Sequence, residues 1–188
     1  MSEVEADVQP LEWFFSRLFK PLFFHAHVLA LSDQVSNATL QNWSNRKHLK
    51  PKIIGGKRLY TPADVAQVVL AEHLSRSLGV MPESGHLMVT SALLVLQRKF
   101  KAKELDDLRH LMFAYEDTAD TPTMVDARTG QPGLFENGGV AFFVIPMARL
   151  LDELARKQIK LIKFNERLIG ESWEKLLAKP RRKRAGKT

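Results

Sequence analysis

Between residues 36 and 79 the chain carries a close succession of helix-start and helix-stop signals, which leaves few ways to fold it. Ser36 suits the N-cap of a helix over residues 37–47, because its hydroxyl can accept an orphan backbone N–H of the first turn. Pro51 ends that helix, since a proline disfavours helical geometry in the residue before it. A shorter helix is predicted over residues 28–35, and the two would meet at a tight link, as in a helix-turn-helix.

A β-hairpin is predicted directly after Pro51. Two short β-prone runs, residues 52–54 and 57–60, flank the pair Gly55-Gly56, which is typical of a tight turn between antiparallel strands.

A longer helix is predicted over residues 62–78. Thr61 suits its N-cap, Pro62 its first position and Asp64 the acidic place of a capping box, and Gly79 ends it. Helix, turn, helix, hairpin and helix, in this order, predict a winged helix-turn-helix.

The positive charge of the chain is concentrated in two segments. The protein has 28 Lys and Arg against 21 Asp and Glu, a formal charge of +7. Six basic residues and no acidic one lie between Asp33 and Asp64, and seven basic residues follow Glu174, so the remainder has 15 basic and 21 acidic residues. A basic patch on an otherwise acidic protein is what binding to a polyanion requires, although a solvated basic face would look the same.

The second short helix is expected to have two different faces. Leu40 and Trp43 would face the core, with a stacking role for Trp43 as the alternative. Amides and an arginine fall largely on the other face, and such side chains can pair with adenine and guanine edges in the major groove.

This segment resembles the DNA-binding domain of MerR-type regulators. The family pattern T-L-R-Y-Y, L-x-P and R-x-Y-[ST]-x-x-D-[IV] corresponds here to residues 39–43 (TLQNW), 49–51 (LKP) and 58–65 (RLYTPADV). The similarity extends over residues 26–79. It implies that Arg58 and Tyr60 contact phosphates and that Gln41 and Asn42 lie where the family's helix contacts DNA.

The chain on either side of this segment is predicted to be mainly helical with a small β insertion. A helix with a buried face is expected over residues 11–18, broken at Pro21. Residues 81–85 are expected to form a loop, and helices are predicted over residues 86–100 and 103–115.

Three strands and a final helix are predicted after these helices. The strands, over residues 123–127, 134–135 and 140–145, would make a small sheet. From Met147 onward, apolar residues recur at close to heptad spacing, which suits either a dimer helix or a helix packed on its own domain. They are Leu150, Leu154, Leu161, Phe164 and Leu168.

The predicted domains are an N-terminal helical extension (1–24), the MerR-like domain (25–79), a dimerisation or sensing region (80–178) and a basic disordered tail (179–188). With no cysteine, the chain has no disulfide, thiolate zinc site or cysteine nucleophile. We expect no cofactor, no metal and no catalysis, because no phosphate-binding loop, nucleophile motif or zinc motif is found. The charged start and the interrupted apolar stretch after it predict a soluble, cytoplasmic protein, associated with the nucleoid.

The sequence thus predicts a transcription regulator that binds double-stranded DNA as a homodimer, and RNA polymerase is a further candidate partner. The predicted DNA-binding residues are Asn37, Thr39, Gln41, Asn42, Asn45, Arg46, Lys57, Arg58 and Tyr60. The alternative is an accessory protein of a phage or mobile element, because the segment is also similar to the DNA-binding domains of excisionases and small terminase subunits.

Overall fold

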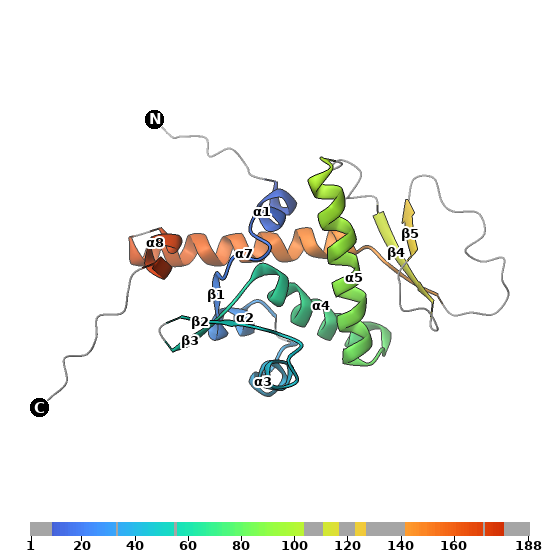
Figure 1. Cartoon of the computed structure of the whole chain (residues 1–188), viewed down its shortest axis with the longest axis horizontal. Helices are drawn as coiled ribbons and strands as arrows, with labels where there is room; N and C mark the ends of the chain where they lie inside the picture. The colour runs from blue at the N-terminus through green and yellow to red at the C-terminus, as the bar shows by residue number, and fades with distance from the viewer. Residues whose placement is uncertain are drawn as a thin grey trace, which may run out of the picture.

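The computed structural model describes residues 9–32, 34–54, 56–103, 111–116, 123–126, 142–170 and 172–178. In these ranges the protein is mainly helical, with two small three-stranded antiparallel sheets (Figure 1). The predicted mainly α class with small β elements is therefore confirmed. The predicted domain boundaries at residues 25 and 80 stay a prediction, and the tail from residue 179 lies outside the described residues.

The N-terminal helix α1 (Pro10–Ser16) carries its predicted apolar face. Leu11, Phe14 and Phe15 are buried, and so is Leu18 just beyond the helix. The helix ends before the predicted break at Pro21.

A short strand, β1 (Phe23–Phe24), leads directly into helix α2 (His25–Ala30). The backbone N–H of Phe24 donates to Nδ1 of His27 (3.2 Å), which holds the start of the helix. The prediction of a helix over residues 28–35 was wrong in its bounds, because it overlooked β1, whose pairing with a later strand places the helix start at His25.

Helix α3 (Asn37–Asn45) begins as predicted. The hydroxyl of Ser36 accepts the N–H of Thr39 (3.0 Å) as the N-cap. Leu40 and Trp43 are buried, so the prediction that Trp43 is a core residue is confirmed. The helix ends two residues earlier than predicted, because Lys47 adopts a positive φ of 63° and the chain turns.

The predicted hairpin consists of β2 (Lys52–Ile54) and β3 (Lys57–Tyr60). In their register Ile53 lies opposite Arg58, and the turn includes Gly56 at φ 76°. The strand β1 pairs with the other edge of β3, which gives the sheet order β1-β3-β2.

Helix α4 (Pro62–Leu78) has the predicted ends. Thr61 and Asp64 form a reciprocal capping box, Pro62 is in the first turn, and Gly79 closes the helix in the left-handed conformation at φ 70°. Nine of its residues are buried, so this helix lies at the centre of the core.

Helix α5 (Pro82–Lys101) begins within the segment that was predicted to be a loop. That prediction was wrong because a proline in the first turn starts a helix as readily as it breaks one. Gly85 then lies in the helix against α4, where an added Cβ would be 3.0 Å from the carbonyl oxygen of Ala71. The glycine therefore allows the close approach of the two helices.

The second sheet contains β4 (Leu111–Glu116), β5 (Thr123–Asp126) and β6 (Phe142–Ile145), in the order β5-β4-β6. Residues 111–115 had been predicted as the end of a helix, and this was wrong. Strand β4 is paired on both edges, and these tertiary hydrogen bonds override the helical preference of a leucine-rich stretch. The predicted strand over residues 134–135 and the helix positions 104–110 lie outside the described residues.

Helix α7 (Met147–Ile169) runs across the molecule and is followed by α8 (Trp173–Ala178) (Figure 1). The first half of α7 packs on α1, α4 and α5, with Leu151, Leu154 and Gln158 buried. In its second half Phe164 and Leu168 are exposed, at 60% and 68%. The first half of α7 is therefore packed on its own chain, as one of the two predictions had it. The dimer contact, which was the other, stays a prediction.

One hydrophobic cluster joins α1, α3, α4, α5, α7 and α8. The indole of Trp173 closes it, donating to the backbone carbonyl of Leu22 (2.7 Å). Among the described helices none is long and apolar enough to span a membrane.

Candidate nucleic-acid interface

Helix α3 presents a row of polar side chains to solvent. Asn37, Gln41, Asn42, Asn45 and Arg46 are all exposed, as their predicted role requires. The helix can expose them because its opposite side buries Leu40 and Trp43 in the core.

The first turn of α3 is held by contacts of its own side chains. Thr39 is half-buried, and its hydroxyl is 2.9 Å from that of the capping residue Ser36. Oδ1 of Asn37 is 2.6 Å from Nε2 of His25, which fixes the start of α3 to α2. Thr39 and Asn37 therefore have structural partners, whereas the exposed amides of Gln41 and Asn45 lie further along the helix.

Tyr60 does not belong to the exposed set. Its side chain is fully buried, and its hydroxyl lies 3.4 Å from Nδ1 of His25. The implied phosphate contact is therefore wrong for this arrangement, because Tyr60 lies at the buried end of β3 where the strand pairs with β1, whereas Arg58 lies toward the turn and is exposed.

The hairpin carries the exposed basic side chains that the sequence predicted. Lys57 and Arg58 are exposed on β3, and Lys52 is exposed on β2. The ammonium of Lys57 lies 5.3 Å from the ring centre of Phe24, a cation–π contact that joins the turn end of β3 to β1.

The hairpin also exposes Ile53, at 71%, and Ile54, at 38%. Neither isoleucine was predicted to have a role. The exposure of at least one of them could have been predicted, because two successive side chains on a strand point to opposite faces and cannot both face a core.

Arg46 has a partner that sequence reasoning missed. Its guanidinium forms an ion pair with the carboxylate of Glu83, although both side chains remain about half exposed or more. Glu83 lies in the first turn of α5, and it was overlooked because that segment had been predicted to be a loop.

Within the described ranges no three histidine or acidic side chains gather in a way that could hold a metal ion. Comparisons of the chain with models of known protein families, with curated proteins and with solved structures found no match. The exposure, charge and contacts of its own residues are therefore the basis for the function of this interface.

Proposed function

We propose that the protein is a winged helix-turn-helix DNA-binding protein that acts as a transcription regulator. In this proposal α2 and α3 are the helix-turn-helix, α3 enters the major groove, and the β2–β3 hairpin is the wing. Gln41, Asn42, Asn45 and Arg46 would contact base edges, and Lys57 and Arg58 would contact phosphates.

The observation that carries the proposal is the pairing of an exposed amide row with an exposed basic hairpin. Both α3 and the hairpin lie on the side of the molecule away from α7 (Figure 1). Between Asp33 and Asp64 the sequence has six basic residues and no acidic one, so these elements bring no negative charge of their own toward phosphates.

We infer that the protein acts as a homodimer. The exposed Phe164 and Leu168 in the second half of α7 support this, because a heptad-like apolar stripe that no described residue of its own chain covers suits a second copy. Two recognition helices would then meet half-sites one helical turn apart.

Two substitutions separate the roles proposed for the hairpin and for α3. Arg58→Ala should weaken binding to all duplexes alike and reduce the slope of log affinity against log salt by about one. Gln41→Ala should leave that slope unchanged and lose discrimination at one or two base pairs. Fluorescence anisotropy with the preferred duplex, obtained by selection from fragmented genomic DNA, measures both.

Lys160→Ala, which removes one exposed basic side chain from α7, is the matched control and should leave the salt slope of the full-length protein unchanged. Equal effects of Arg58→Ala and Lys160→Ala would contradict the proposed wing. Enrichment of inverted repeats beside promoters would support a regulator. Enrichment at attachment or packaging sites would point instead to an accessory protein of a mobile element.

A further inference from the structure

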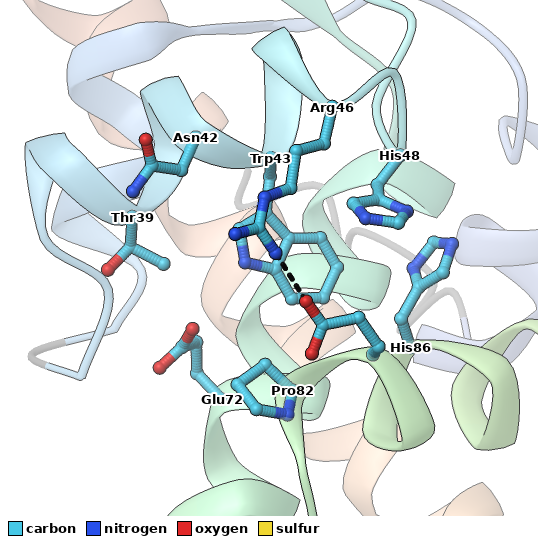
Figure 2. Close-up of a pocket in the computed structure, with 9 residues that line it drawn as sticks. Thr39, Asn42, Trp43, Arg46, His48, Glu72, Pro82 and His86 are labelled. Atoms are coloured by element: carbon cyan, nitrogen blue, oxygen red, sulfur yellow. Dashed lines mark hydrogen bonds and ion pairs between the residues drawn. The ribbon is translucent and has the colours of Figure 1, made fainter.

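A cavity of about 180 Å³ lies behind α3, between this helix, α4 and the first turn of α5. Figure 2 shows the side chains that line it. None of the roles proposed for α3 in DNA binding requires a cavity at this place.

One part of the wall is aromatic. The ring of Trp43 lies 5.6 Å from that of His48 and 5.1 Å from that of His86, and the two imidazoles are 5.1 Å apart, all centre to centre. The three rings pack on one another, edge to face or tilted, so they form one continuous aromatic wall on which an organic cation can lie.

The other part of the wall is acidic. Glu72 comes from α4 and Glu83 from α5, and in Figure 2 the indole of Trp43 lies between the carboxylate of Glu72 and the two imidazoles. Glu83 is already paired with Arg46. Glu72 therefore supplies the negative charge that a bound cation would meet.

The charge of Glu72 is incompletely compensated. Burial raises the pKa of its carboxyl group, and this outweighs the nearby charge of Arg76 and a hydrogen bond from the Trp43 side chain, which both act to lower it. The guanidinium of Arg76 is exposed and donates to the carbonyl of Gln34 (2.9 Å). A cation inside the cavity would stabilise the carboxylate more directly.

The imidazole of His86 suits the same ligand. Burial, together with the neighbouring His48, lowers the pKa of His86, so this ring is neutral at neutral pH and does not repel a cation. Its Nδ1 is buried and has no hydrogen-bond partner among the described residues. A ligand N–H could donate to that atom.

We propose that this cavity is a binding site for a small organic cation, an amine with a short apolar body, held by the Trp43, His48 and His86 rings and by the carboxylate of Glu72. An anion fits less well, because Glu83 already occupies the positive end of α5 and Arg46 is already paired.

The test uses three probes of similar shape and different charge: benzylamine, benzyl alcohol and benzoate. The protein has three tryptophans, so the indole N–H region of a ¹H–¹⁵N spectrum reports the site directly, and Trp43→Phe identifies the signal of Trp43. Benzylamine should shift that signal saturably in the millimolar range, while the signals of Trp13 and Trp173 stay in place. Benzyl alcohol and benzoate should bind more weakly.

Glu72→Gln, which keeps the shape of the side chain, should weaken benzylamine binding about tenfold, because it removes a charge-assisted contact. Acidification should also weaken binding in the wild-type protein, because a protonated His86 brings a positive charge to the ring wall and a protonated Glu72 no longer carries the negative one. Equal affinity for benzylamine and benzyl alcohol would overturn the proposal, as would preference for benzoate or an unmoved Trp43 signal. The comparison of the three probes uses the wild-type protein, so it tests the proposed site even if Glu72→Gln does not fold.

Discussion

At the scale of single residues, the side chains of α3 divide into those held by the protein and those left for a partner. Gln41 and Asn45 are exposed, whereas Asn37 and Thr39 contact His25 and Ser36. Arg46 is intermediate, because it is exposed but paired with a carboxylate of α5. In the proposed DNA complex, the ion pair with Glu83 would compete with DNA for the guanidinium of Arg46.

Glu83→Gln should strengthen DNA binding. The substitution releases the guanidinium of Arg46 and removes a negative charge beside the proposed recognition helix, and we expect affinity to rise about three- to tenfold at low salt. Stability should change little, since an exposed ion pair contributes at most about 1 kcal/mol. Anisotropy titrations against the preferred duplex, together with thermal unfolding, measure both quantities.

Glu153→Gln is the control for this prediction. It breaks an exposed ion pair of the same kind, with Arg149 on α7, and removes the same charge from the protein. If both variants raised the affinity equally, the effect would come from net charge and not from Arg46.

At the scale of elements, α8 is joined to the rest of the molecule mainly through Trp173. The indole N–H donates to the carbonyl of Leu22 (2.7 Å) in the buried region, and the ring packs against Phe24 (5.8 Å) and His27 (5.1 Å) between centres. The contact spans 151 positions of sequence, so it ties the C-terminal helices to the chain just before β1.

Trp173→Phe should therefore destabilise the protein by about 1–3 kcal/mol, because it leaves the buried carbonyl of Leu22 without its donor. Phenylalanine keeps part of the aromatic packing, so most of the loss reports the hydrogen bond. Urea unfolding followed by far-UV circular dichroism measures it. Trp13→Phe, at a half-buried position of α1, should cost less, and an equal or larger cost there would assign the effect to lost ring area.

The elements that the sequence predicted well are those with local signals at both ends. The capping box of Thr61 and Asp64 and the closing Gly79 define α4, and Ser36 defines the start of α3. The start of α2 and the strand β4 were missed because distant pairing decides them, β1 with β3 and β4 with two other strands. The start of α5 at Pro82 was predicted wrongly, because a proline is favourable in the first turn of a helix but breaks the interior of one.

In the candidate interface, too, the features set by local sequence were predicted and those set by tertiary packing were not. Exposure of the α3 amides and of Lys57 and Arg58 followed from periodicity and charge, which are local. The burial of Tyr60 depends on the pairing of β3 with β1, and the ion pair of Arg46 with Glu83 depends on where α5 lies beside α3. No local sequence pattern reports either arrangement.

At the scale of the whole molecule, stability should fall as the pH is lowered through the range where histidine titrates. Burial lowers the pKa of His27 and of His86 from the usual 6.5, and His48 adds to the effect on His86. Above pH 6.5 the two imidazoles are neutral in both the folded and the unfolded state, and their burial costs no stability. Below pH 6.5 they are protonated more readily in the unfolded chain, so the free energy of unfolding decreases as the pH falls toward the folded-state pKa values.

We expect this loss to be on the order of 1 kcal/mol or less between about pH 7.5 and about pH 5.5, since both rings are partly solvated. The raised pKa of Glu72 acts with the opposite sign at lower pH, where the folded state takes up the proton first. Urea midpoints across this range measure the slope. His27→Asn with His86→Asn should flatten it. A steep slope in the double variant would contradict the assignment.

The second half of α7 carries the proposed contact between two copies. Phe164 and Leu168 are one turn apart on the exposed side of this helix, and no described residue of the same chain covers them (60% and 68% exposed). If they form the proposed dimer contact, Phe164→Ser with Leu168→Ser should convert the dimer to a monomer in sedimentation experiments at micromolar protein. Affinity for a single half-site should persist, while affinity for an inverted repeat should fall, because the two recognition helices are no longer linked.

Leu87→Ser with Leu94→Ser on α5 is the matched control, since these leucines are 56% and 51% exposed and lie on a different helix. The control pair should leave the mass in solution unchanged, because it removes exposed apolar side chains outside the proposed contact. A wild-type protein that sediments as a monomer at all concentrations would exclude the dimer. Loss of association in the α5 pair and not in the α7 pair would instead place the contact between copies on α5.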